Sequence, residues 1–465
     1  MGYTAQVRVA PGRKTAIIGA GCVLKDAAEI LAANGLALFS AVEIGNLTMG
    51  AAACCHTKNR HLPGERGALS SYVVGTVFVD GRGRVHRVRS SEAAVAVGGA
   101  EYYTVDGAPS DRCPKQLMRH ARSSHGLLGV VVEVEVAVRA VAGRSIDHMT
   151  FSRGSDFAAF AAARRAPSVD ASRLCVAFKL RSRTDDPRRR RGVAATTHFQ
   201  RVDDSRRRGV AATAPARRRS LFAYVSPSLD RYLVEMQRAT PAPPRESWFW
   251  GVRERLIVSV FPLFFRFGDA LPSGAARRFY AALHLVGEFA LRILHKHPSA
   301  PPGAHIGWHD HTSTTKFQWT FLALPLEKAE RVFAELRKFC AAYEARTGYS
   351  NAYFVSYVMD QDALATFSYA ATGPVVTIDP IAANSCDRFL PFCRALATHL
   401  ESTVGGLKGA FNQSIGVPPR TLGVAVSGHA GANDFVVLRR KLDPDDRFLN
   451  PYFTELLQGV AGHSH

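Results

Sequence analysis

The sequence predicts an α+β fold with two or three domains, and three observations lead to that class. The chain has 465 residues, 47% of them apolar, which supports more than one hydrophobic core at roughly 100–200 residues per domain. Short strand patterns surround one clear helix over residues 1–142. From about Leu221 onward, strand and helix patterns alternate, as expected of a second α+β unit.

The first elements are two strands and a helix. Residues 6–10 (QVRVA) and 14–22 (KTAIIGAGC) have the composition of short β-strands. Residues 24–38 (LKDAAEILAANGLAL) carry apolar side chains at helical spacing. Gly35 follows the last periodic residue, where a left-handed glycine commonly ends a helix.

A hairpin and a long strand complete the amino-terminal pattern. Residues 70–88 form two alternating runs around Asp80-Gly81, a dipeptide typical of hairpin turns. Residues 129–141 (GVVVEVEVAVRAV) alternate Val with Glu at a period of two. That alternation predicts a strand with one buried and one solvated face.

Helices dominate the second half of the chain. Residues 326–349 predict a strong amphipathic helix. Its apolar face comprises Ala329, Val332, Phe333, Leu336 and Phe339. Residues 273–296 and 386–406 predict two more helices, and YFVSYVM (353–359) and GPVVTID (373–379) predict strands between them.

Nine of the twenty net positive charges lie in one stretch, thirteen Arg minus four Asp. Residues 181–219 contain thirteen Arg and four Asp, and the string RRRGVAAT occurs in it twice. Such a run is usually a solvated, disordered loop, and it could also be retained non-coding sequence. Nucleic-acid binding is the weaker hypothesis, because Phe199 is the one aromatic residue available there for stacking on bases.

Cysteine usage and hydropathy predict a cytoplasmic protein. The eight cysteines are scattered, with only Cys54 and Cys55 adjacent, which favours reduced thiols over a disulfide framework. The first residues lack the apolar core of a signal peptide. The longest apolar stretch, 256–265, is too short to span a bilayer, although peripheral membrane contact stays open.

Two distant segments carry a family resemblance: SSHGLLGVVVEVEV (123–136) and RRKLDPDDRFLNPYF (439–453). As an ordered pair they resemble the flavin-domain signatures of FAD-linked oxidases in the vanillyl-alcohol oxidase superfamily, which have a PCMH-type FAD-binding domain. By pattern the chain is most similar to the aldonolactone oxidases, the gulonolactone and D-arabinono-1,4-lactone oxidases. Their chains also end in a Leu-Asp-Pro-x-x-x-Phe-x-Asn segment.

The resemblance implies FAD held between two small sheets, with small-residue turns that bring backbone N–H groups to the pyrophosphate. The residues that match the family's cofactor contacts are Gly45, Asn46, Thr48, Gly50, Ala51, His56, Thr57, Ser70, Ser71, Val73, Gly126, Gly129, Val130, Val131 and Asn450. For residues 45–57 the alternative is a small-residue loop packed on a strand. We also prefer that packed loop to a nucleophilic role for Cys54 and Cys55. For Asn450 the alternative is a structural helix cap.

The catalytic positions depart from the family pattern. The family's substrate-binding Glu, Arg and Lys correspond to Phe321, to a position near Ser356 and to one near Asn412, with Lys408 close enough to act instead. In the polar cluster HIGWHDH (305–311), His309 and His311 are candidates for a base or hydrogen-bond donor. Surface-loop histidines and a metal site are the other interpretations, and we predict no metal.

The family also begins with a strand and a Gly-x-Gly-His-Ser turn that has no counterpart here, so we expect an incomplete gene model or weakened FAD binding. The predicted domains are an FAD-binding domain (1–142), the start of the substrate domain (143–180), a disordered insertion (181–220), the substrate domain (221–435) and a returning tail (436–465). The predicted function is oxidation of a CH–OH group of a small polar, sugar- or lactone-like substrate, with electrons passed to oxygen or another acceptor. A degenerate, non-catalytic flavoprotein fold is the alternative.

Overall fold

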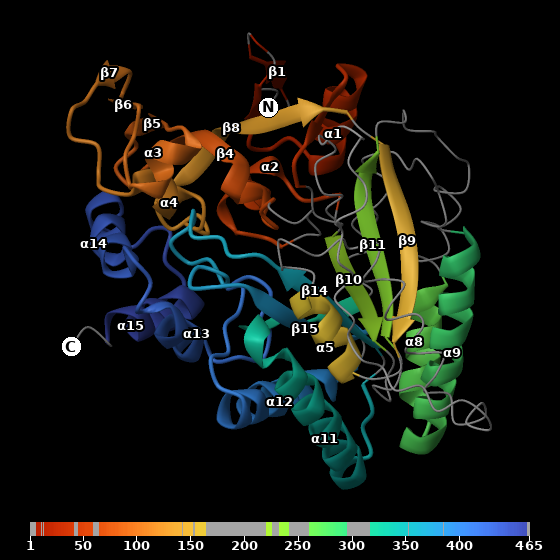
Figure 1. The fold of residues 1–465 in the computed structure, drawn as a ribbon. Coiled ribbons are helices and arrows are strands. Elements are labelled where there is room, and N and C mark those ends of the chain that lie inside the picture. Colours follow the sequence, from red (N-terminus) through yellow and green to blue (C-terminus); the bar gives the residue numbers. More distant parts are fainter. Residues whose placement is uncertain are drawn as a thin grey trace, which may run out of the picture.

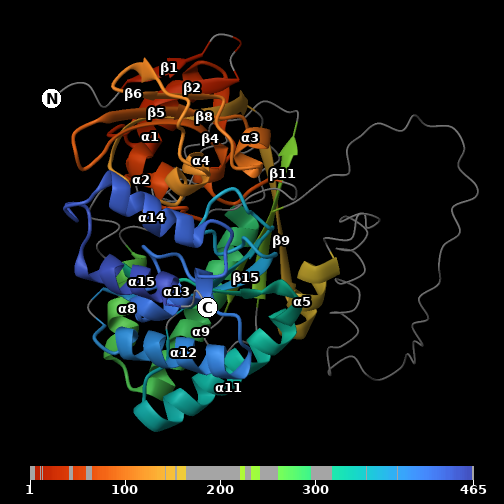
Figure 2. The same ribbon diagram turned by 90° about the vertical axis from the view of Figure 1, so that its left-hand side faces the viewer.

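Two antiparallel sheets, each with its own helices, build the protein (Figure 1). The structure is a computed structural model, and it describes residues 6–10, 12, 14–40, 45–58, 65–141, 143–151, 154–163, 220–225, 232–240, 260–294, 317–351, 353–384 and 386–462. The first sheet and its helices come from the amino-terminal part of the chain, and the second from the middle. The carboxyl-terminal helices lie against both parts (Figures 1 and 2).

The first sheet has the strand order β1-β2-β8-β4-β5-β6-β7 within the described residues, with β3 paired to β8. Its strands are β1 (Val7–Val9), β2 (Thr15–Gly19), β3 (Leu36–Leu38), β4 (Val73–Val79), β5 (Val85–Arg89), β6 (Tyr102–Val105), β7 (Ala108–Pro109) and β8 (Val130–Ala140). The predicted alternation holds in the second half of β8, whereas Val130 and Val132, on the same face, are exposed. Val134 and Val136 are buried, whereas Glu133 forms an ion pair with Arg8 and Glu135 one with Arg89.

Short helices cover one face of this sheet: α1 (Leu24–Ala33), α2 (Met49–Cys54), the 3-10 turn η1 (Leu69–Tyr72), α3 (Glu92–Ala96) and α4 (Leu117–Ala121). Helix α1 ends as predicted, because Gly35 adopts φ +71°, which side chains with a Cβ rarely do. The predicted hairpin is β4–β5. Its loop is held by Asp80, whose carboxylate accepts hydrogen bonds from the backbone N–H groups of Arg82 and Arg84.

The second sheet has the order β12-β15-β14-β10-β11-β9 within the described residues, with β13 paired to β15. Its strands are β9 (Gly143–Phe151), β10 (Ser220–Val225), β11 (Tyr232–Thr240), β12 (Phe317–Trp319), β13 (Leu322–Pro325), β14 (Tyr353–Met359) and β15 (Val375–Ala383). Its helices are α5 (Gly154–Ala163), α8 (Phe261–Ala270), α9 (Ser273–Leu294), α11 (Ala329–Thr347), preceded by η3 (Leu326–Lys328), and α12 (Phe389–Thr403).

Strand β14 shows how the faces of this sheet are used. Phe354 packs on Phe392 of α12, with ring centroids 6.4 Å apart. Tyr353, on the opposite face, packs on His284 of α9 at 5.7 Å. Helices α11 and α12 therefore cover one face, and α8 and α9 cover one end of the other. The predicted apolar face of α11 is confirmed, since all five of its residues are buried.

The tail consists of α13 (Pro419–Val426), α14 (Ala432–Leu442) and α15 (Pro451–Ala461). Helix α14 lies beneath the helices of the first sheet (Figure 2). The backbone N–H of Gly81 donates to the carbonyl of Leu442 at 2.9 Å. Asp443 is buried, pairs with Arg439 at 2.8 Å and accepts the N–H of Phe448. The Leu-Asp-Pro segment thus fastens the tail to the β4–β5 hairpin.

The α+β class with two sheets is confirmed, while the domain boundaries stay a prediction. The predicted insertion 181–220 lies outside the described residues except for Ser220, the first residue of β10. No helix in the described part of the chain is long and apolar enough to cross a bilayer. The cysteines that the structure describes are all free thiols.

The contact between α13 and α15 depends on glycine. A Cβ on Gly423 would lie 2.0 Å from the carbonyl oxygen of Leu456, a backbone atom that cannot move aside cheaply. We expect Gly423→Ala to lower the free energy of unfolding by about 1–3 kcal/mol through overpacking. Gly428→Ala is the control, since a Cβ there meets nothing within 4 Å, and its effect should stay within about 0.5 kcal/mol. Urea unfolding of both variants measures the difference; equal losses would contradict this packing.

Candidate functional site

A buried ion pair joins the two parts of the protein. The ammonium of Lys58, in the loop after α2, lies 2.6 Å from the carboxylate of Asp379 on β15. Their side chains are only 10% and 5% exposed. Two charges withdrawn from water in this way must pair with each other, because an unpaired buried ion costs several kcal/mol. The pair therefore marks a specific, water-poor junction between the first sheet's loops and the second sheet.

Aromatic rings surround the lysine. Its Nζ lies 4.3 Å from the ring centroid of Tyr357 and 5.0 Å from that of Phe321. Such cation–π contacts strengthen when solvent is excluded. Tyr369 packs edge-on against Phe321 at 4.8 Å, and burial together with nearby carboxylates raises its pKa well above the ordinary value. We call this group, Lys58, Asp379, Phe321, Tyr357 and Tyr369, the Lys58–Asp379 site.

His56 connects the site to both parts of the chain. Its Nδ1 lies 2.8 Å from the hydroxyl of Ser70, and its Nε2 lies 3.0 Å from the hydroxyl of Ser368. The ring also packs against Tyr369 at 5.3 Å. Burial lowers the pKa of His56, so the imidazole is neutral near pH 7 and one of its nitrogens accepts a hydrogen bond.

Arg122 is the most deeply buried cation among the described residues. Its Nε and Nη2 donate to the carbonyl of Val73, while its Nη1 has no hydrogen-bond partner. Burial lowers its pKa to about 10, and the carboxylate of Asp362 opposes that shift. A buried guanidinium with a free N–H is rare in proteins, and it suits an anionic group.

The carboxyl tail reaches the same region. His125 follows Arg122 closely, and its backbone N–H donates to the carbonyl of Cys54 at 3.0 Å. The His125 ring packs on Phe411 at 5.2 Å and on Phe453 at 5.7 Å. The amino-terminal turn (45–57), the 123–129 turn and the tail therefore meet in space.

The predicted phosphate turn is a tightly packed helix start. Thr48 caps α2 by accepting the N–H of Ala51 at 3.3 Å, and the N–H of Gly50 donates to the carbonyl of Ala20 at 2.8 Å. Gly45 accepts the N–H of Lys25, while Asn46 is half-buried. The N–H groups of Gly50 and Ala51 therefore already donate hydrogen bonds within the protein. This agrees with the alternative interpretation of 45–57 as a small-residue segment packed on a strand.

The other predicted cofactor residues fall into two groups. Thr57, Ser70, Ser71 and Val73 are buried beside His56. Ser71 donates to Asp362 through a short hydrogen bond. Gly126 and Gly129 have φ +80° and +151°, and a Cβ on Gly129 would lie 2.3 Å from the carbonyl oxygen of Val79. Val130, which follows this turn, is exposed, and Val131 is half-buried. The turn is thus shaped by glycine, while the cofactor roles stay predictions.

Asn450 is placed as a helix cap. Its Oδ1 accepts the N–H of Phe453 at 3.0 Å at the start of α15, and the residue is exposed. This geometry is that of the structural alternative. Any contact with a flavin ring remains a prediction for this position.

Of the predicted catalytic residues, the structure describes Lys408 alone, because His309 and His311 lie outside the described residues. Lys408 is half-buried and donates to the hydroxyl of Thr372. Burial lowers its pKa, and the carboxylate of Glu327 opposes that shift. Lys408 pairs with Ala323 in an isolated bridge, so its side chain lies on the face of the sheet that carries Phe321.

The positions that the sequence resemblance pairs with the family's Glu, Arg and Lys carry uncharged side chains. Phe321, which the resemblance pairs with the family's Glu, is fully buried in the Lys58–Asp379 site. Ser356 points to the opposite face of β14, toward α12, and its neighbour Tyr357 faces the site. Asn412 is exposed. Lys58 and Asp379 were not identified as site residues from the sequence. Asp379 could have been found, because it is a charged residue at the end of the apolar strand GPVVTID.

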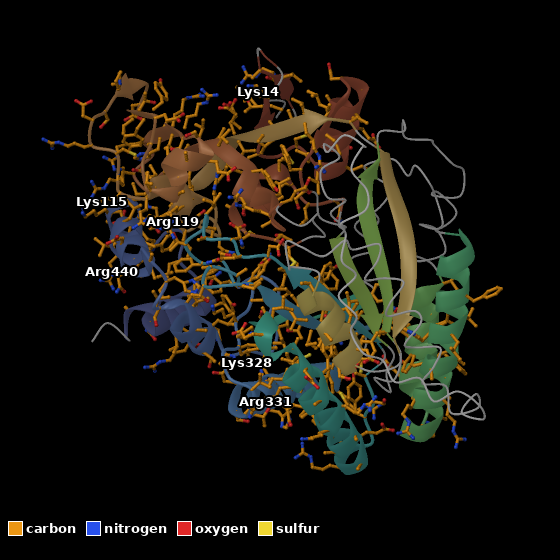
Figure 3. The ribbon with its side chains drawn as sticks, in the orientation of Figure 1. Lys14, Lys115, Arg119, Lys328, Arg331 and Arg440 are labelled. Carbon is orange, nitrogen blue, oxygen red and sulfur yellow. The ribbon has the colours of Figure 1, made fainter. Side chains whose placement is uncertain are left out.

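A separate hollow of about 350 Å³ lies beside α3 and α4. Its lining residues are Ala96, Val97, Gly98, Lys115, Gln116 and Arg119. Figure 3 places Lys115 and Arg119 on the same side of the molecule as Arg440 of α14. None of the predicted site residues lines this hollow, so we keep the candidate site at the junction.

Comparison with solved structures identifies the fold. The chain is similar to a "solvent-stable cholesterol oxidase" (TM-score 0.59, 14% identity), covering 97% of this chain and 83% of that one. It is also similar to cholesterol oxidase from B. sterolicum (0.61, 12%, 97% and 82%) and to a chitooligosaccharide oxidase (0.52, 14%, 97% and 80%). The chain thus has the fold of these oxidases. No protein-family model and no curated sequence matches it.

The Lys58–Asp379 pair makes a testable contribution to stability. Lys58→Met leaves the Asp379 carboxylate buried without its cation, so we expect a loss of about 3–5 kcal/mol in unfolding free energy. Lys58→Met combined with Asp379→Leu removes both charges and should recover at least half of that loss. Chemical denaturation of the two single variants and the double variant measures the coupling. Additive effects would show that the pair is not coupled.

Buried neutral histidines should make the protein acid-sensitive. Burial lowers the pKa of His120 to about 3, whereas an unfolded histidine titrates near 6.5. Between those values the unfolded chain binds the extra proton, so stability falls as the pH drops from about 6.5, by up to about 1.4 kcal/mol per pH unit for one such group. We expect His120→Gln to flatten this slope in denaturation curves at pH 7, 6 and 5. An unchanged slope would exclude His120 as a contributor.

Proposed function

We propose that this protein is an FAD-dependent oxidoreductase that oxidises a CH–OH group of a small substrate and passes the electrons to oxygen or another acceptor. The proposal depends on one observation above all. The amino-terminal turn, the 123–129 turn, the tail and the Lys58–Asp379 site meet at one junction, in a fold shared with proteins that are named oxidases.

The residues at the junction suit a dinucleotide that carries negative charge. Arg122 offers a buried cation with a free N–H. The 126–129 turn brings backbone close to its neighbours without side-chain interference. His56, Ser70 and Ser71 supply hydroxyl and imidazole partners in the same water-poor region. When bound, FAD would supply the acceptor for the hydride that leaves the substrate carbon.

The chain itself must then manage the hydroxyl proton. In our proposal the carboxylate of Asp379 accepts that proton as the C–H bond breaks. The ammonium of Lys58, 2.6 Å away, stabilises the negative charge that develops on the substrate oxygen. Phe321 and Tyr357 keep water out, which strengthens both electrostatic effects.

The substrate class is the finer part of the proposal. A sugar- or aldonolactone-like alcohol agrees with the family pattern of the tail and with the similarity to a chitooligosaccharide oxidase. The rings of Phe321 and Tyr357 beside Lys58 would also suit a less polar alcohol, and two of the similar structures are named cholesterol oxidases. Activity on a panel of both alcohol classes decides between them.

A non-catalytic flavoprotein fold is the second candidate. Phe321 at the position of the family's Glu favours it, because that substitution removes a substrate-binding charge. Under this alternative the Lys58–Asp379 pair has a structural role only, and the two proposals differ in what the purified protein does.

The test of function begins with the colour of the purified protein. We expect a yellow protein, or one that becomes yellow when FAD is added, and bleaching of the flavin absorbance when an alcohol substrate is added anaerobically. Asp379→Asn should lower kcat per bound FAD at least about 100-fold, because it removes the proton acceptor. Turnover is counted per bound FAD because the unpaired Lys58 also lowers the stability of this variant. Lys441→Met, an exposed position on α14, is the control and should keep full activity.

The outcomes separate the candidates. A protein that binds FAD but is reduced by no alcohol supports the non-catalytic fold. A protein that binds no FAD, neither as purified nor after FAD is added, overturns both the oxidoreductase and the non-catalytic flavoprotein proposals. Unchanged turnover in Asp379→Asn would show that Asp379 is not the proton acceptor. The oxidoreductase proposal would then be judged by whether an alcohol bleaches the flavin absorbance.

A further inference from the structure

An apolar surface lies on the outer side of the α8–α9 helix pair. Six large apolar side chains on these helices are exposed: Leu263 (62%), Phe264 (38%), Phe267 (56%), Leu285 (47%), Val286 (65%) and Phe289 (67%). Single exposed apolar residues are common on proteins, but contiguous groups mark interaction sites. We call these six residues the α8–α9 face.

The face is continuous across the two helices. Phe279 of α9 is half-buried, and its ring contacts Phe264 at 6.2 Å and Phe267 at 5.2 Å. It therefore bridges the exposed rings of α8 to α9. Along α9, Val286 follows Phe279 after seven residues, or two turns, on nearly the same side of the helix. Leu285 and Phe289 are exposed beside Val286 and widen this apolar strip around the helix.

The inner side of the helix pair is firmly packed, so this outer face is not a loosely held element. Tyr280 lies against Phe265, and its hydroxyl donates to the carboxylate of Asp269 at 2.6 Å and lies 3.0 Å from the carbonyl oxygen of Phe265. His284 packs on Tyr353 of the second sheet. The helices thus present a fixed apolar surface to solvent.

Basic side chains border the face. Arg266, Arg277 and Arg278 are exposed, and Arg277 has a weak ion pair with Glu344 at 3.5 Å. The acidic residue of α8, Asp269, is only partly accessible and is held by Tyr280. Over α8 and α9 the sequence has four Arg against two acidic residues, so the helix pair is net positive.

We propose that the α8–α9 face docks on the surface of an anionic lipid bilayer, with its apolar side chains in the headgroup–acyl boundary and its arginines on lipid phosphates. Interfacial helices combine these same features, an apolar face with aromatic residues and a basic border. Charge complementarity favours this occupant over a second copy of the chain, because two copies would bring the same arginines together. The helices lie in the surface and do not cross it.

The test measures binding of the full-length protein to vesicles. We expect co-sedimentation with phosphatidylcholine vesicles that contain phosphatidylserine at about 30 mol%, and at least tenfold weaker binding to pure phosphatidylcholine. Phe267→Ser, Val286→Ser and Phe289→Ser combined should reduce binding more than tenfold. The matched control combines Val85→Ser, Val97→Ser and Val437→Ser, three exposed valines elsewhere, and should bind as the parent does.

A second variant separates the electrostatic part. Arg266→Gln with Arg278→Gln should weaken binding to the anionic vesicles at least tenfold and leave the weak binding to neutral vesicles unchanged. The proposal is overturned if the parent protein binds neither vesicle, or if the serine variant binds as well as the parent. Sedimentation velocity gives a further outcome that overturns it. If the parent protein self-associates, and the serine variant loses that self-association but still binds vesicles, the face is a contact between two copies.

Discussion

The structure depends on one electrostatic constraint, the burial of Lys58 against Asp379. One partner comes from a loop of the first sheet and the other from a strand of the second, so neither charge is compensated until the two parts meet. A buried pair of this kind adds little net stability compared with apolar packing, yet removing one partner is costly. Its main effect is therefore to fix how the two parts sit against each other, which is also what positions the junction.

Further polar contacts extend this constraint along the junction. The loop after β14 meets the first part at Ser71–Asp362, at His120–Thr366 and at His56–Ser368. The histidines in these contacts are buried, which lowers their pKa and keeps them uncharged. The junction thus combines the Lys58–Asp379 pair and a longer Arg66–Asp362 pair, at 3.7 Å, with hydrogen bonds made by neutral histidines and hydroxyls. Such an environment is polar but nearly dry, and electrostatic effects there are stronger than in water.

Local patterns in the sequence predicted the local structure well. Gly35 after α1, the Val–Glu alternation of β8 and the apolar face of α11 each follow from spacing within one element. The site was predicted less well, because Lys58 and Asp379 are brought together by the register of a distant sheet. Ser356 shows the same limit. A position shifted by one residue along a strand changes face, so Tyr357 and not Ser356 reaches the site.

The second sheet also relates the junction to the outer helices. Tyr353 and Tyr357 lie on the same face of β14, four residues or roughly 13 Å apart. Tyr353 contacts α9, and Tyr357 contacts Lys58. The helix pair that carries the apolar face and the ion pair at the candidate site therefore share one face of one sheet. Because a sheet is stiff over so few residues, a partner bound at α8–α9 would be held at a fixed distance from the chemistry at the junction.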